Sequence, residues 1–241
     1  MDAKTLRARA RKLWREELRS LLITALVLFA VRSSFADWNT VPTGSMKPTI
    51  LEGDRIFVNK LAYDLKVPFT TLHLAQWSNP QRGDIVVFYS PKDGERLVKR
   101  TVGLPGDTVE LRHDQLIING KTVEYKSLAD DLLPDITASD RANSVYAAEE
   151  LPGRSHLVAG IPAAPALRDF GPVRVPADSY FLMGDNRDNS FDSRYFGTVK
   201  RSRILGRATT VVASLDAQHH WRPRWDRFFS SLDEPSSRRA E

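Results

Sequence analysis

A succession of short β-rich runs between Arg55 and Leu215 is the feature that most restricts the fold of this chain. Each run is rich in Val, Ile, Phe or Thr and is bounded by Gly, Pro, Asp or Asn, which favour turns. Asn119-Gly120, between two apolar runs, predicts a hairpin. The pattern therefore predicts a mainly β protein of the barrel or folded-sheet kind. The expected strands are 55–59, 84–89, 96–102, 108–111, the hairpin within 116–123, 179–183 and 204–215.

The one convincing helix candidate lies at the N-terminus, where a basic segment precedes an apolar run. Seven Lys and Arg residues stand within residues 1–19, and residues 21–31 are almost entirely apolar. A basic flank predicts that the N-terminus stays in the cytoplasm while the following chain crosses the membrane. The run is shorter than the roughly 20 residues that span a bilayer. Extension to 20–36 approaches that length and includes Arg32, whose side chain can reach the headgroups from a helix end.

Two alternatives to a retained anchor remain open. Ser34-Phe35-Ala36 resembles a small-x-small cleavage site, so the segment also fits a removable signal peptide. Its length also fits a buried helix of a soluble protein. No later stretch is apolar enough for a second span. We expect a single retained anchor at 20–36 after a cytoplasmic segment at 1–19.

Charge and cysteine content exclude several classes of chemistry. The net charge is +5, but basic residues concentrate before the apolar run, which favours a lipid bilayer over nucleic acid as partner. The chain contains no cysteine, which excludes disulfides, thiolate catalysis and thiolate zinc sites. It also lacks a His-Glu-x-x-His helix and a phosphate-binding glycine loop. No metal or cofactor is expected, and the oligomeric state is left open.

The first candidate site is the segment Val-Pro-Thr-Gly-Ser-Met-Lys-Pro-Thr at 41–49. Pro42 and Pro48 stiffen the chain, and Gly44 permits backbone shapes closed to other residues. Such a loop can present the Ser45 hydroxyl and turn a backbone N–H toward a developing oxyanion. On its own, Gly-Ser between prolines is more often a simple turn.

A base for Ser45 is not supplied by histidine. The chain has no Gly-x-Ser-x-Gly elbow, and its five histidines form no triad pattern. Lys99 lies in an apolar strand with Leu97 and Thr101 on the same face. Lowering a lysine pKa from about 10.4 to 7–8 disfavours the charged form by roughly 3–5 kcal/mol, within reach of burial. The neutral amine can then accept a hydroxyl proton, although an ordinary surface lysine beside Arg100 is the simpler alternative.

Two further segments are rich in polar or aromatic groups. The segment 184–197 is dense in Asp, Asn and Arg, which fits a rigid hydrogen-bonded loop. Calcium binding is the alternative, but the arginines and the absence of EF-hand spacing argue against it. The tail at 219–241 fits either a membrane interface or a partly ordered basic segment. Its aromatic residues and the arginines interleaved with them are Trp221, Arg222, Arg224, Trp225, Arg227, Phe228 and Phe229.

Five segments together resemble the conserved boxes of bacterial type I signal peptidases. They occur in the family's order and cover most of residues 32–215. The resemblance implies a folded β core, shared with repressor-type proteases, at 37–107 and 172–218, and an inserted β-rich subdomain at 108–171 of the Gram-negative kind. Within this insertion, residues 124–171 have a less regular sequence. The matching segments are 43–49, 53–60, 83–88, 98–107 and 184–190.

The resemblance also implies a role for each matched residue. Ser45 would be the nucleophile and Lys99 the general base. The Ser45 N–H and the Thr43 hydroxyl would form the oxyanion hole, with threonine where many members have serine. Ser190 would orient the lysine amine. The charge network would comprise Arg100, Asp185, Asp192 and Arg194, and the S1 and S3 pocket walls Val41, Pro42, Met46, Ile50, Leu97 and Val98.

The implied function is a membrane-bound serine endopeptidase that removes signal peptides from exported preproteins with small-x-small cleavage sites. The expected location is the bacterial cytoplasmic (inner) membrane, with the catalytic domain on the periplasmic or extracytoplasmic side. One alternative is a self-cleaving repressor-type Ser/Lys protease, but residues 1–40 leave no room for its DNA-binding helices beside the apolar run. The other is a non-enzymatic anchored β-domain, whose activity would survive replacement of Ser45 or Lys99.

Overall fold

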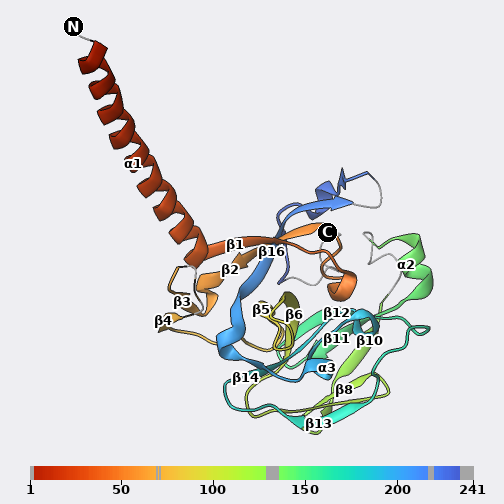
Figure 1. Ribbon diagram of the computed structural model, residues 1–241. Helices are drawn as coiled ribbons and strands as arrows, with labels where there is room; N and C mark the ends of the chain where they lie inside the picture. Colours follow the sequence, from red (N-terminus) through yellow and green to blue (C-terminus); the bar gives the residue numbers. More distant parts are fainter. Residues whose placement is uncertain (1–2, 69, 71, 129–135, 217–219, 234–241) are drawn as a thin grey trace.

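A computed structural model describes residues 3–68, 70, 72–128, 136–216 and 220–233 (Figure 1). A long helix, α1 (Ala3–Phe35), projects away from a β-rich body, with the N-terminus at its far end. Residues Glu17–Phe35 form the one helical segment among the described residues that is long and apolar enough to cross a membrane, with a mean hydropathy of 1.6. Leu21, Leu26 and Leu28 on this segment are exposed. The helix therefore exposes an apolar surface, as a membrane anchor does. The side chain of Arg32 lies outside the described part.

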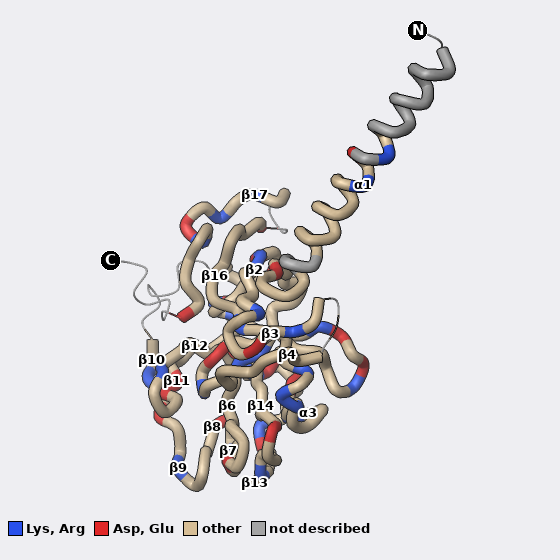
Figure 2. The backbone as a smooth tube through the Cα atoms, turned by 90° about the vertical axis from the view of Figure 1, so that its left-hand side faces the viewer, with Lys and Arg blue, Asp and Glu red and all other residues tan. Residues whose placement is uncertain are grey.

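Figure 2 shows charged positions, mostly basic, near the middle of α1, followed toward the body by described turns without Lys, Arg, Asp or Glu. Residues of both charges are spread along the backbone of the body. This distribution matches the order of a basic flank and an apolar span that the sequence predicts.

The body is built on a nine-stranded antiparallel sheet, which confirms the mainly β prediction. Its order is β1-β2-β16-β5-β6-β14-β15, with β17 and β18 also paired to β16. The long strand β16 pairs first with β5 and then with β2, and register shifts along both pairings bend the sheet. The strands are β1 (Ala36–Thr40), β2 (Asp54–Asn59), β5 (Ile85–Tyr89), β6 (Arg96–Gly103), β14 (Ser179–Met183), β15 (Val199–Lys200), β16 (Ile204–Asp216), β17 (Arg222–Pro223) and β18 (Ser230–Ser231).

Smaller sheets lie between β6 and β14 in the sequence. One has the order β13-β7-β8-β9 and another the order β10-β11-β12. A two-stranded hairpin, β3-β4, follows β2 near the foot of α1. The bounds are β3 (Asp64–Lys66), β4 (His73–Gln76), β7 (Thr108–Arg112), β8 (Gln115–Ile118), β9 (Lys121–Thr122), β10 (Glu124–Ser127), β11 (Val145–Leu151), β12 (Arg154–Gly160) and β13 (Phe170–Arg174).

Each strand expected from the sequence is present to within one residue, but several strands were not predicted. The three-stranded sheet β10-β11-β12 occupies much of the stretch 124–171, of which residues 129–135 lie outside the description. Strand β11 reads Val-Tyr-Ala-Ala-Glu-Glu-Leu, and Ala and Glu have low strand propensity. Pairing with two neighbours, rather than local preference, makes it a strand. Two short helices, α2 (Ala138–Asn143) and α3 (Ser193–Phe196), were also not predicted.

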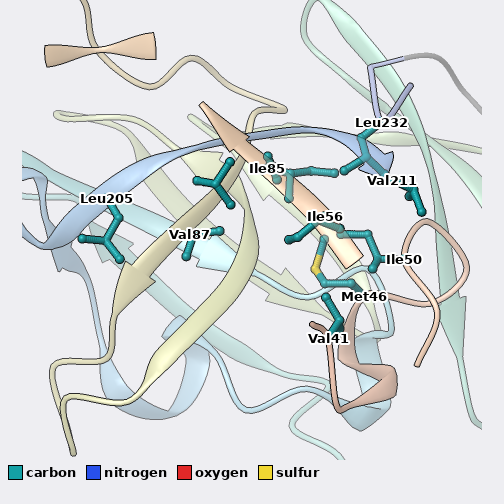
Figure 3. Packing of buried hydrophobic residues seen from close by; sticks show 11 residues of the cluster. Val41, Met46, Ile50, Ile56, Ile85, Val87, Leu205, Val211 and Leu232 are labelled. Carbon is teal, nitrogen blue, oxygen red and sulfur yellow. The ribbon is translucent and has the colours of Figure 1, made fainter. Parts of the chain in front are cut away.

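The described part of the body contains four hydrophobic clusters, two of which are larger than the others. The first fills the bend of the main sheet beneath the loop that carries Ser45 (Figure 3). The second joins the β7-β8 hairpin to β14 through Phe181 and Met183. The first cluster consists of Val41, Met46, Ile50, Ile56, Val58, Ile85, Val87, Leu205, Ala208, Val211 and Leu232.

The described part of the C-terminal tail, residues 220–233, packs on the body. Arg227, in the 3₁₀ helix η7 (Trp225–Arg227), is buried and donates to the carboxylate of Asp54 at 2.6 Å. Trp221, Trp225 and Phe229 are exposed beside it. The tail therefore has a docked arginine and outward-facing aromatic rings, while residues 219 and 234–241 lie outside the description.

Candidate active site

Ser45 and Lys99 meet although 54 positions separate them in the chain. Ser45 lies in the 3₁₀ helix η1 (Gly44–Met46), just beyond β1, and Lys99 lies in the middle of β6. The Lys99 amine donates to Ser45 Oγ at 2.6 Å and to the Val98 carbonyl at 3.1 Å. Only 7% of Ser45 and 3% of Lys99 are exposed. The two groups thus form a buried pair within hydrogen-bonding distance.

The loop that carries Ser45 is held from both sides. Met46 is fully buried in the first hydrophobic cluster. On the other side, Asn186 donates from its backbone to the Ser45 carbonyl and from its side chain to the Gly44 carbonyl, each at 3.1 Å. A side chain at Gly44 would come within 2.9 Å of Glu52. The serine therefore sits in a fixed turn, as a nucleophile requires.

Burial lowers the pKa of Lys99 to about 8. Asp192 and Asp185 act in the opposite direction, but each is already paired with its own arginine. No carboxylate hydrogen-bonds the Lys99 amine among the described residues. Because both acids are neutralised elsewhere, desolvation outweighs their attraction and favours the neutral amine.

The charge network expected from the sequence is present. Arg100 donates to both oxygens of Asp185, at 2.8 and 2.6 Å, and Arg194 donates to both oxygens of Asp192, at 2.9 Å each. Asp192 also accepts from the backbone N–H of Gly184 at 3.0 Å. Both pairs are bidentate and buried. They fix the loop that contacts Ser45.

Thr43 and Ser190 both lie next to the pair, with different geometry. The Thr43 hydroxyl donates to Ser45 Oγ at 3.5 Å. The Ser190 hydroxyl is buried against Gly184, where a Cβ would lie 2.2 Å from it, and makes no hydrogen bond to the described residues. The structure therefore brings Ser190 to the site without joining its hydroxyl to the Lys99 amine.

A cleft of about 310 Å³ opens beside Ser45 and Lys99. Four of the six residues expected in its walls line it: Val41, Pro42, Leu97 and Val98. Met46 and Ile50 do not line it but are fully buried in the cluster behind it. The lining residues that sequence analysis did not identify are Asn39, Thr40, Ile56, Val87, Glu95 and Arg96.

A second buried polar cluster was also missed. Glu149 accepts from Tyr125 and from Arg187, each at 2.6 Å, and Arg187 donates to the Gly184 carbonyl. His156 lies beside Glu149, and burial lowers its pKa well below the usual value, so the ring is neutral. This cluster joins the β10-β11-β12 sheet to the loop at 184–190. Its members are too far apart in the sequence to form a recognisable motif.

We expect Asp185→Ala to destabilise the fold by about 3–5 kcal/mol, because it leaves the buried Arg100 without a counter-charge. Denaturant unfolding of the detergent-solubilised protein measures the change. The double variant Arg100→Met, Asp185→Leu should recover most of the loss, since it removes both charges. Equal destabilisation in the single and double variants would contradict this account.

A buried serine that contacts a lysine amine beside an open cleft fits the class of serine endopeptidases, and the apolar helix fits a membrane anchor. The family model for signal peptidase, peptidase S26, matches residues 14–213. The chain therefore belongs to the signal peptidase I family, and its activity is the cleavage of signal peptides from preproteins. This excludes the non-enzymatic β-domain and the self-cleaving repressor as its function.

Curated relatives are similar over most of the chain. Signal peptidase I of Buchnera aphidicola subsp. Schizaphis graminum is 33% identical, over 87% of this chain and 78% of its own. Signal peptidase I of Pseudomonas fluorescens is 36% identical, over 81% and 71%. The crystal structure of a signal peptidase I from Enterococcus faecalis V583 is 36% identical and covers 54% of this chain and 97% of its own, with a TM-score of 0.32.

Proposed function

We propose that Ser45 is the nucleophile and Lys99 the general base of the peptidase reaction. The observation that carries this assignment is the 2.6 Å contact between the Lys99 amine and Ser45 Oγ in a buried site. A lysine with a pKa of about 8 is partly neutral near neutral pH. The neutral amine presents a lone pair to the hydroxyl, which is the requirement for a base.

The reaction then proceeds in two stages. Lys99 accepts the proton of Ser45 Oγ as the oxygen attacks the scissile carbonyl, and later gives it to the departing amine. The signal peptide remains as an ester on Ser45. Water enters, loses a proton to Lys99 and attacks the ester. Lys99 returns this proton to Ser45 Oγ as the ester bond breaks, which frees the signal peptide and restores the Ser45 hydroxyl. Lys99 serves both stages, because it accepts one proton from the Ser45 hydroxyl in the first and one from water in the second.

The oxyanion is stabilised by the Ser45 N–H and the Thr43 hydroxyl. Ser45 lies in the first turn of η1, where leading N–H groups have no partner within the helix. The Thr43 hydroxyl lies 3.5 Å from Ser45 Oγ and can rotate toward the carbonyl oxygen. Ser190, buried against Gly184 next to the pair, positions the lysine amine once substrate enters.

The substrate binds in the cleft as an extended strand. Strand β1 pairs with β2 alone, and residues 96–99 of β6 pair with β5 alone, among the described strands. Residues 39–40 of β1 and 96–99 of β6 line the cleft, and an added strand can pair with the edge of a sheet at such positions. Residues one and three before the cut point to the same face of that strand. Val41, Leu97 and Val98 leave space there for small side chains, which accounts for a small-x-small preference.

The helix α1 is a retained anchor with its N-terminus in the cytoplasm, and the body lies on the extracytoplasmic face of the bacterial inner membrane. The basic residues within 1–19 support this orientation, because basic flanks stay on the cytoplasmic side. We assign the catalytic core to residues 37–107 and 172–218 and the inserted subdomain to 108–171. The exposed rings of the segment 219–241 meet the membrane interface. No cofactor takes part.

Cleavage of a preprotein with an Ala-x-Ala site by the detergent-solubilised enzyme tests this function. Mass spectrometry should locate a single cut directly after the second alanine. Product formation that persists in the Ser45→Ala variant would disprove the assignment. A cut at a different position would disprove the proposed placement of the substrate.

The pH profile should report the titration of Lys99. Since the base must be neutral, log kcat/KM should rise with a slope of one as pH increases and level off above about 8. The rate rises with pH because the Lys99 amine is protonated below its pKa and cannot then accept a proton. Rates measured from pH 5 to 10 with one preprotein check this expectation. A profile that is flat below pH 8 would contradict the role of Lys99.

A further inference from the structure

The outer end of the cleft carries an ion pair that joins its two walls. Arg96, the first residue of β6, donates to Asp37 at 3.1 Å and to Asn39 at 2.6 Å, both on β1. Arg96 and Asn39 also line the cleft, Arg96 as the residue of β6 farthest from Lys99 on that side and Asn39 as the next-to-last residue of β1. We call Arg96, Asp37 and Asn39 the cleft bridge.

The cleft bridge lies at the end of the cleft that faces the anchor. Strand β1 begins directly after α1 ends, at the foot of the helix (Figure 1). Lys60 donates to the Ser33 carbonyl in the last turns of α1 at 2.9 Å, and its amine lies 3.6 Å from Asp37. A signal peptide carries its apolar segment before the cleavage site. If that segment shares the bilayer with α1, the substrate reaches Ser45 past the cleft bridge.

The distance from the cut to the cleft bridge fixes which substrate residues meet it. Lys99 is three positions after Arg96 on β6, which is about 10 Å in an extended strand. A substrate strand alongside β6, with its scissile carbonyl at Ser45, therefore places its fourth and fifth residues before the cut beside Arg96. A large apolar side chain there would displace water from the ion pair without replacing its hydrogen bonds. A small or polar side chain would leave the pair hydrated.

We propose that the cleft bridge determines specificity at the fourth and fifth residues before the cut. It accepts small or polar residues and excludes large apolar ones. The apolar segment of the signal peptide therefore stops short of the cleft, and the cut falls at a set distance from the bilayer. This inference rests on the proposed placement of the substrate along β1 and β6.

A pair of preproteins tests the proposal. Both carry Ala-x-Ala, and they differ only in having Ser-Ser or Leu-Leu at the fourth and fifth positions before the cut. The measured quantity is the ratio of their kcat/KM values for the wild type, Arg96→Met and Arg112→Met. Arg112 is the matched control, because it pairs with Glu110 on β7 and is 66% exposed there.

The wild type and Arg112→Met should both prefer Ser-Ser by at least about tenfold, through KM. In Arg96→Met this preference should fall at least about fivefold, because methionine tolerates an apolar neighbour. Asp37→Asn, which keeps an oxygen acceptor but removes the charge, should give an intermediate ratio. The site of cleavage, read by mass spectrometry, should be unchanged for Ser-Ser.

Two results would overturn the proposal: no preference in the wild type, or the same ratio in Arg96→Met as in the wild type. An unchanged ratio that comes with an equal loss on both substrates would make the cleft bridge a brace between β1 and β6 without a role in specificity. The Ser45→Ala enzyme, assayed on the Ser-Ser preprotein, tests the catalytic assignment separately. Cleavage there would disprove the proposed function, whereas its absence combined with an unchanged ratio would disprove the cleft bridge alone.

Discussion

Ser45→Ala is expected to lower kcat/KM for preprotein cleavage by at least about 10⁴-fold. The variant removes the one oxygen that lies 2.6 Å from the Lys99 amine and faces the cleft. Water cannot replace it efficiently, because the attacking group gains its advantage from being held in place. Cleavage of an Ala-x-Ala preprotein, followed by gel or mass spectrometry, measures the loss.

The fold of the Ser45→Ala variant should be unchanged. The loop is held through the buried Met46 and through the backbone contacts of Asn186, none of which involves Ser45 Oγ. Circular dichroism and the unfolding midpoint therefore serve as controls. Ser155→Ala on β12, a serine that donates to Glu150 far along the chain from the cleft residues, is the matched control and should retain activity. A Ser45→Ala enzyme that is folded and active would refute the nucleophile assignment.

Lys99→Met and Lys99→Arg are expected to lower kcat/KM by at least about 10³-fold. Methionine has no proton acceptor of sufficient basicity. Arginine keeps the positive charge but does not lose its proton in this pH range. The arginine variant separates the two possible roles of the residue, because an electrostatic role would survive this change and a basic role would not. Lys126→Met, at an exposed lysine paired with Glu150, is the control.

The Lys99→Met variant should also be more stable than the wild type at neutral pH. Burial lowers the lysine pKa from 10.5 to about 8. This difference corresponds to at most about 3 kcal/mol of unfavourable free energy, and the lost contacts to Ser45 and Val98 offset part of the gain. This unfavourable free energy of burying the charged amine is fully present below pH 8, where the lysine is protonated in both the folded and the unfolded state. It disappears above pH 10.5, where the lysine is neutral in both states.

The pH dependence of unfolding tests whether the buried charged amine destabilises the folded state. Wild-type stability should increase relative to that of Lys99→Met as pH rises from about 8 to 10.5, because the unfolded lysine binds a proton that the folded one has lost. Denaturant midpoints at several pH values measure the difference. A constant difference across this window would show that the buried amine titrates normally. In that case the assignment of Lys99 as base would lack its physical foundation.

Much of the fold was predictable because local pattern specifies it. The runs at 85–89 and 96–103 are rich in β-branched residues and bounded by turns, and Asn119-Gly120 formed the expected hairpin. Strand β1 was missed because Ala-Asp-Trp-Asn-Thr has little strand preference and becomes a strand through pairing with β2. The β10-β11-β12 sheet was missed for the same reason.

For the candidate site, the sequence predicted some of the functional residues and missed others. The family resemblance identified Ser45, Lys99 and the four residues of the charge network, and the structure brings all of them together. The resemblance did not identify Glu149, Tyr125 or the cleft bridge. These groups belong to no short motif, and each interacts with partners distant in the chain. Met46 and Ile50 were expected in the cleft wall, but their packing places them behind it.

The sequence by itself determined which chemistry is available: a serine in a stiff loop, no cysteine, no histidine triad and a lysine in an apolar strand. Only the tertiary structure decided that this lysine can act as a base. The strand order β2-β16-β5-β6 brings it to the serine, and packing removes water from its amine. Arg100 and Arg194 neutralise the two nearby acids. A pKa depends on solvent and on charges within a few ångströms, and the fold alone sets both.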